Sequence, residues 1–128
     1  MTPRQLTFED CEAVSDLETR LFDGRFDTAG LRELLGKPAF YGAVLPAPDM
    51  PTTIHAYCLA YITSTQADII AIGTDKTKQG RGFGQIILQH LIDVTEQHNV
   101  AEITLEVAAD NIAARRLYDS CGFHVSGI

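Results

Sequence analysis

The sequence has few basic residues, and this scarcity limits the partners it can bind. Ten lysines and arginines stand against seventeen aspartates and glutamates, for a formal net charge of −7. A broad nucleic-acid surface needs clustered positive charge, so we expect no nucleic-acid partner. An anionic ligand must therefore bind at a local site, and elsewhere the surface should favour cations.

Cysteines are also few and far apart along the chain. The three, Cys11, Cys58 and Cys121, form an odd and scattered set that suits reduced, buried thiols better than a disulfide framework. No pairing of these cysteines with the histidines has the spacing of a zinc site. We therefore predict no structural metal.

Long apolar runs are missing as well. Stretches such as Ile69–Ile72 fall far short of the roughly 20 residues that cross a bilayer. The first ten residues do not resemble a secretion signal, since no basic stretch precedes an apolar core. These absences predict a cytoplasmic protein with no membrane partner. The 128 residues, 45% of them hydrophobic, predict a single domain over residues 1–128.

The N-terminal third of the chain has the pattern of two amphipathic helices. Thr7 followed by Asp10 resembles a capping box, and apolar residues then recur at helical spacing until near Gly24. A second, shorter helix is predicted around Leu31–Leu35. Gly36 and the proline that follows it predict its end.

The central part of the chain has the pattern of strands that lead into a glycine-rich turn. Residues 40–45 and 54–63 are apolar, aromatic and branched, which predicts an antiparallel pair joined by a proline-rich loop. A third apolar run, residues 67–72, leads into the turn. A helix with a period of about 3.6 residues is predicted to begin at or just after Gly84 and to end near His98-Asn99.

The last part of the chain predicts one more strand, helix and strand. Residues 103–107 alternate between apolar and polar, as a strand does. Asp110 and Asn111 then begin a helix, which Gly122 ends before a strand over residues 123–128. This order of elements, without an internal repeat, predicts a mixed α/β fold around one sheet.

The glycine turn runs Gln79-Gly80-Arg81-Gly82-Phe83-Gly84. Glycines leave backbone amides unobstructed, and the next helix adds its orphan amides and the positive end of its dipole. Such a turn is suited to binding an anion. The alternative is a turn whose glycines only permit tight packing. The spacing matches neither a P-loop nor a dinucleotide fingerprint.

This turn resembles the Q/R-x-x-G-x-G/A signature of the GCN5-related N-acetyltransferase (GNAT) superfamily. A later run is similar to the ribosomal-protein-alanine (RimI-like) branch: Leu105-Glu106-Val107, Asn111, Leu117-Tyr118 and Gly122-Phe123. The resemblance implies the GNAT fold, a central mixed, mostly antiparallel sheet flanked by helices. The family continues beyond the equivalent of Ile128, so we expect its last C-terminal strand to be absent. The open sheet edge that results would favour a homodimer.

The resemblance implies acetyl-CoA as the donor substrate. Its pyrophosphate is expected on the turn, and its pantetheine arm is expected along the strand that ends at Ile72. The residues so implied are Ile70, Ile72, Gln79, Gly80, Arg81, Gly82, Phe83, Gly84 and Asn111. For Asn111, a helix cap is an equally simple interpretation.

The resemblance also implies two catalytic residues. Glu106 would accept a proton from the incoming amine, through water, and Tyr118 would protonate the departing thiolate. From the residues alone, Glu106 could equally be a solvated strand carboxylate and Tyr118 a core aromatic. Cys121 has no motif histidine beside it, so we treat it as a core residue and not as a nucleophile.

The acceptor is predicted less sharply than the donor. At pH 7 an α-amine is neutral about a tenth of the time, whereas a lysine amine is neutral in about one part in 2,500. A weakly perturbed base therefore favours a protein or peptide N-terminal α-amine. Two alternatives stay open: acetylation of a small-molecule amine, and a non-catalytic acyl-CoA-binding or regulatory module.

Overall fold

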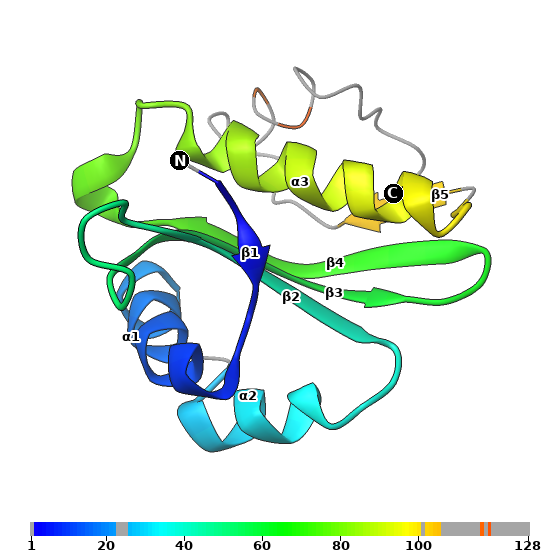
Figure 1. The fold of residues 1–128 in the computed structure, drawn as a ribbon, viewed down its shortest axis with the longest axis horizontal. Coiled ribbons are helices and arrows are strands. Elements are labelled where there is room, and N and C mark those ends of the chain that lie inside the picture. The colour runs from blue at the N-terminus through cyan, green and yellow to red at the C-terminus, as the bar shows by residue number, and fades with distance from the viewer. Residues whose placement is uncertain (1, 23–25, 101, 106–115, 117, 119–128) are drawn as a thin grey trace.

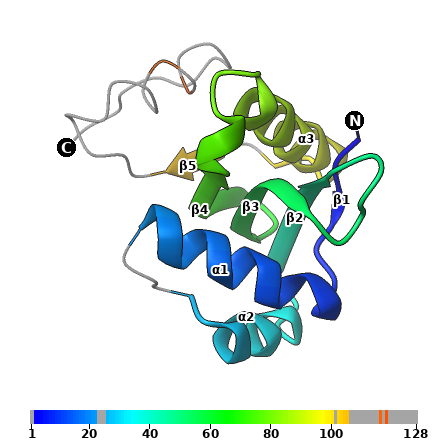
Figure 2. The ribbon, with the colours of Figure 1, turned by 90° about the vertical axis from the view of Figure 1, so that its left-hand side faces the viewer.

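The protein is described by a computed structural model that covers residues 2–22, 26–100 and 102–105, together with Arg116 and Tyr118. Within these residues a five-stranded sheet runs in chain order, β1-β2-β3-β4-β5. Helix α3 covers one face of the sheet, and α1 and α2 cover the other (Figure 1; Figure 2). In chain order the elements are β1 (Arg4–Gln5), η1 (Phe8–Asp10), α1 (Cys11–Leu21), α2 (Thr28–Leu35), β2 (Phe40–Pro46), β3 (Ile54–Ile62), β4 (Gln66–Thr74), η2 (Lys76–Lys78), α3 (Phe83–Gln97) and β5 (Glu102–Leu105).

The sheet has one parallel pair and is otherwise antiparallel. Strands β1 to β4 pair antiparallel with their neighbours, while β4 and β5 are parallel. A parallel pair needs a crossover connection, and α3 lies in the chain between these two strands. The predicted mixed α/β fold with a mostly antiparallel sheet is confirmed. The short strand β1 was not predicted.

At the start of α1, the Asp10 carboxylate accepts several hydrogen bonds. Thr7 and Asp10 form the predicted capping box, although it opens the short helix η1 that leads into α1. The Asp10 carboxylate also accepts hydrogen bonds from the Arg4 guanidinium at 2.6 and 3.0 Å. One buried carboxylate therefore fastens β1 to the first helical turn.

The ends of α2 are set by two residues in different ways. The Asp27 side chain caps its start by accepting a hydrogen bond from the Gly30 amide at 2.6 Å. Gly36 lies at its end, as predicted, but with a right-handed φ of −79°. This position therefore does not use the left-handed conformation that favours glycine at helix ends.

Apolar clusters fill both faces of the sheet. The cluster on the α1–α2 side contains Leu6, Cys11, Val14, Leu17, Leu31, Phe40, Val44, Ile54, Tyr57 and Leu59. The cluster on the α3 side contains Ala43, Leu45, Ala56, Cys58, Ala60, Ile69, Ile87, Leu88, Leu91 and Tyr118. Cys11 and Cys58 are free and buried, as predicted, and burial raises the pKa of the Cys58 thiol to about 12.

Several predictions fall on residues that the structure does not describe. Glu106, Asn111, Cys121 and the predicted final strand lie outside the described residues, and of the last helix only Arg116 and Tyr118 are described. In the part of the chain that is described, no helix is both long enough and apolar enough to span a membrane.

Candidate functional site

Among the described residues, the backbone amides of the glycine turn have no hydrogen-bond partner. The first helical hydrogen bond of α3 runs from the Ile86 amide to the Gly82 carbonyl, at 3.1 Å. Among the described residues, no acceptor receives a hydrogen bond from the amides of residues 80–85. Gly80, Arg81 and Gly82 are exposed, so this part of the turn is accessible to solvent at the positive end of a 15-residue helix.

The two exposed glycines are required by conformation and not by packing. Gly80 and Gly82 have φ angles of +82° and +80°, in the left-handed region that other residues rarely adopt. A Cβ built on either one would meet nothing within 4 Å. For Gly80 and Gly82, tight packing against the described residues is therefore not the reason for glycine, and no described atom fills the space in front of them.

The loop before the turn is braced by its own side chains. Asp75 accepts hydrogen bonds from the amide and hydroxyl of Thr77, both at 3.0 Å, and so caps η2. The Gln79 side chain donates to the Thr74 carbonyl at 3.2 Å, which links the turn to the end of β4. The side chain of Gln79, predicted to bind the donor, thus contacts the protein's own backbone.

Positive charge gathers around the turn although the chain is acidic overall. Lys76, Lys78 and Arg81 all belong to this segment, and Arg81 is exposed. The hydrogen bond from the Thr77 amide, with smaller contributions from the charges of Arg20 and Lys78, holds the pKa of Asp75 below its ordinary value. Three basic side chains and the amides of the turn therefore belong to one short segment.

Strand β4 is paired differently in its two halves. Its first half, residues 66–69, pairs with β5 on one side. In its second half, Ala71–Thr74, the only pairing that the structure describes is with β3. The register shifts at Ile70, so that Ile70 and Ala71 pack on the α1–α2 side while Ile72 packs on the α3 side.

The strand also extends to Thr74, two residues beyond its predicted end at Ile72.

Tyr118 lies in the apolar cluster on the α3 side of the sheet. Its side chain is 8% exposed, and burial raises its pKa to about 12. This is the environment expected of a core aromatic, and it keeps the phenol protonated at neutral pH. Its role in catalysis stays a prediction, as do the roles of Glu106 and Asn111.

His55 was missed by the sequence analysis although it lies against the turn. Its ring stacks on Phe83, the first residue of α3, with ring centroids 5.2 Å apart and planes 9° apart. A lone histidine near the start of a strand carries no motif, so only the fold could reveal this contact.

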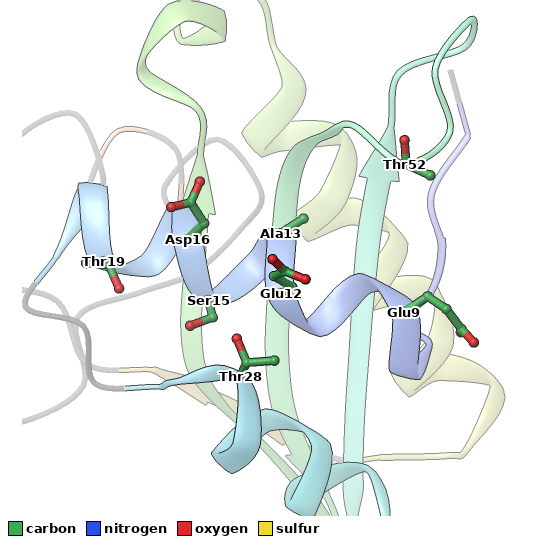
Figure 3. A pocket seen from close by; sticks show the side chains of 8 residues that line it. All are labelled: Glu9, Glu12, Ala13, Ser15, Asp16, Thr19, Thr28 and Thr52. Carbon is green, nitrogen blue, oxygen red and sulfur yellow. The ribbon is translucent and has the colours of Figure 1, made fainter.

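A hollow of about 560 Å³ lies elsewhere, along the outer side of α1 (Figure 3). The carboxylates of Glu9, Glu12 and Asp16 line it, together with the start of α2 and the β2–β3 loop. Asp16 pairs with Arg20 at 3.2 Å. Carboxylates near the start of a helix are favoured by its dipole, which accounts for Glu9 and Glu12 without a ligand.

Comparison with known proteins agrees with this geometry. The chain is 38% identical over 73 residues to the ribosomal protein bS18-alanine N-acetyltransferase of Escherichia coli (strain K12). That match covers 57% of the chain and 49% of the relative, so it spans about half of the relative's length. N-alpha-acetyltransferase RimI of Mycobacterium tuberculosis is 30% identical over 128 residues, which covers 96% of the chain and 78% of that protein.

A solved structure and a family match extend the comparison to the whole chain. The crystal structure of the ribosomal-protein-S18-alanine N-acetyltransferase from Escherichia coli matches with a TM-score of 0.85 at 27% identity, covering 98% of this chain and 79% of that one. Residues 11–123 match the family described as the acetyltransferase (GNAT) family. This protein therefore belongs to the acetyltransferase (GNAT) family.

Proposed function

We propose that this chain transfers the acetyl group of acetyl-CoA to a primary amine, by direct attack within a ternary complex. The observation that carries the proposal is the exposed glycine turn before α3, whose amides have no hydrogen-bond partner among the described residues. Together with the family to which the chain belongs, these amides favour acetyl-CoA as the donor.

The donor's pyrophosphate is proposed to bind at the turn. Its oxygens would accept hydrogen bonds from the amides of Arg81, Gly82, Phe83 and Gly84, at the positive end of the helix. The open space above Gly80 and Gly82 supports this fit, because a Cβ there would occupy the approach. The Arg81 side chain adds a positive charge, and we propose Asn111 as a further contact to the pantetheine arm.

The pantetheine arm is proposed to lie along the second half of β4. An extended amide chain can pair with an exposed strand edge as an added strand would. The edge of β4 over Ala71–Thr74 suits this mode, and it begins beside Ile70 and includes Ile72. A strand amide near Ile72 would then polarise the thioester carbonyl.

Acetyl transfer forms one bond and breaks another. The neutral amine attacks the thioester carbon, the C–N bond forms, and the C–S bond breaks to release the thiolate of CoA. We propose that Glu106 accepts the proton from the amine through water. Tyr118 is proposed to protonate the departing thiolate, since its phenol still carries its proton at neutral pH, and water returns a proton to the phenolate.

The acceptor is proposed to be the α-amine of a protein or peptide N-terminus. Relatives whose names specify ribosomal-protein alanine or N-alpha acetylation support this choice. An α-amine also has a lower pKa than a lysine amine, so a weaker base is enough to deprotonate it. A homodimer and a cytoplasmic location stay predictions from the sequence.

The test begins with calorimetry of the wild-type chain and acetyl-CoA. A thiol-release assay across N-terminal peptides and small amines then identifies the acceptor. Glu106→Gln and Tyr118→Phe should each lower kcat by roughly 10²- to 10⁴-fold. Binding without thiol release would favour the acyl-CoA-binding module, and near-normal turnover in both variants would contradict the mechanism.

A further inference from the structure

His55 occupies an irregular position at the start of β3. Pro46 pairs with Ile54 and Leu45 pairs with Ala56, so His55 is an extra residue in the β2–β3 register. Such bulges redirect a side chain, and they are frequent beside functional sites. Here the extra residue directs its ring toward the first residue of α3.

The same residue contacts both ends of the segment that carries the amides. Its ring stacks on Phe83 with centroids 5.2 Å apart, and its carbonyl accepts a hydrogen bond from the Asp75 amide at 2.9 Å. Asp75 follows β4 directly, and Phe83 begins α3. The intervening residues 76–82 are mostly exposed, so the position of the turn depends strongly on its two ends.

The His55 ring is buried, but among the described residues its Nδ1 has no hydrogen-bond partner. The residue is 7% exposed, and Nδ1 makes no hydrogen bond in the part of the chain described. A buried polar atom without a partner destabilises the fold, so hydrogen bonding through Nδ1 does not account for a histidine here. The contact that the described residues show for this ring is its flat stacking on Phe83, which stabilises by stacking and by burial of area.

We infer that His55 is a positioning residue for the donor site, and that it holds the turn through its ring and not through Nδ1. This inference rests on the proposed function, because it concerns the affinity of the turn for acetyl-CoA. The ring supports Phe83 from beneath, and Phe83 sets where α3 begins and where its first free amides point.

Two substitutions separate the ring from the nitrogen. His55→Ala removes the stacked ring, and we expect the Kd and KM for acetyl-CoA to rise roughly 3- to 10-fold, the range expected for loss of one aromatic pair. We expect kcat at saturating acetyl-CoA to stay within about 2-fold, since no reacting atom is touched. His55→Phe keeps the ring and should bind acetyl-CoA within about 2-fold of wild type.

A double-mutant cycle distinguishes loss of the contact between His55 and Phe83 from general damage to the fold. Phe83→Ala removes the other ring, and in its background His55→Ala should cause little further loss of affinity, because the contact is already gone. Full additivity of the two losses would contradict the inference. Should His55→Ala fail to fold, His55→Phe and Phe83→Ala carry the test through their Kd values.

The outcomes distinguish this inference from the function on which it rests. If wild-type chain fails to bind acetyl-CoA in calorimetry, the proposed function fails and the inference with it. If wild type binds and His55→Ala binds equally tightly, the inference alone is wrong. Equal loss of affinity in His55→Phe and His55→Ala would assign the role to the nitrogen and overturn the inference as stated.

Discussion

Gly73 and Gly82 lie close in sequence but serve opposite purposes. A Cβ on Gly73 would lie 2.7 Å from the Tyr57 hydroxyl, within a closed part of the α1–α2 face. A Cβ on Gly82 would meet nothing within 4 Å, but its φ of +80° is left-handed. Gly73 is required because there is no room for a Cβ, and Gly82 is required because of its left-handed backbone conformation.

The surroundings of these glycines differ in the same way. Next to Gly73, the Tyr57 hydroxyl donates to the Glu18 carboxylate, and both residues are buried. Burial, and then the hydrogen bond to Glu18, raise the pKa of Tyr57 far above its ordinary value. Next to Gly82, polar amides are left open. The comparison teaches that satisfied polar groups mark the part that holds the fold, and open ones the part available to a ligand.

The largest effect is expected where the buried pair is broken. Tyr57→Phe removes the hydrogen bond and leaves the Glu18 carboxylate buried without its donor, so the free energy of unfolding should fall by about 3 kcal/mol. Urea denaturation measures this loss. Tyr61→Phe is the matched control, since the described residues show no hydrogen bond from the Tyr61 hydroxyl, and it should change stability by less than about 0.5 kcal/mol.

A smaller loss of stability is expected when a side chain is added in the closed space around Gly73. Gly73→Ala pushes a methyl group against Tyr57, which cannot move without losing Glu18, and should lower the free energy of unfolding by about 2 kcal/mol. Gly36→Ala is the control, because its Cβ would lie an ordinary 3.5 Å from the Glu33 carbonyl. Equal stability of the two variants in urea would contradict the packing role of Gly73.

The pH dependence tests the buried carboxylate at the start of α1. Burial alone would raise the pKa of Asp10, but hydrogen bonds from Arg4 and Thr7 outweigh it and hold the pKa below its ordinary value. The stabilisation is therefore present above the unfolded pKa of about 3.9 and is lost as the pH falls through the folded one.

Asp10→Asn should accordingly lower the free energy of unfolding by about 1–2 kcal/mol at pH 7. The difference from wild type should shrink as the pH falls below about 4. Asp16→Asn breaks only an exposed ion pair with Arg20, so it should shift stability by less than about 0.5 kcal/mol at either pH. A pH-independent difference for Asp10→Asn would show that charge is not its contribution.

A loss of stability no larger than that of Asp10→Asn, paired with a clear loss of acetyl-CoA affinity, is expected at the open turn. Gly82→Ala places a residue with a side chain in the left-handed region, which costs about 1–2 kcal/mol of stability. The shifted amides should weaken acetyl-CoA binding by about 10-fold in calorimetry. Gly36→Ala, at a right-handed φ, should leave this affinity unchanged. Unchanged affinity in Gly82→Ala would argue against the turn as the donor site.

Much of the fold follows from local pattern. Helices α1 and α3 were predicted from residues recurring at helical spacing, and their observed ends differ by a few residues at most. The pair β2–β3 followed from two branched, aromatic runs around a proline-rich loop. Strand β1 escaped prediction because two polar residues show no periodicity and become a strand only by pairing with β2.

In the candidate site, too, some features could be predicted from the sequence and others appear only in the folded protein. The glycine turn was visible in sequence because alternate glycines before a helix carry a known physical consequence. The different reasons for glycine at these two positions were not visible in the sequence, since both glycines simply lie between the third predicted strand and the helix that follows it. Only the position of Tyr57 in one case, and of open space in the other, separates them.

Local sequence patterns revealed the helices, the strands after β1, the glycine turn and the positive charge beside it, because each depends on neighbours along the chain. The tertiary structure decided the contacts of His55 with Phe83 and of Glu18 with Tyr57, which are 28 and 39 positions apart. Such contacts depend on how the sheet pairs and where the helices pack on it. No local periodicity contains that information.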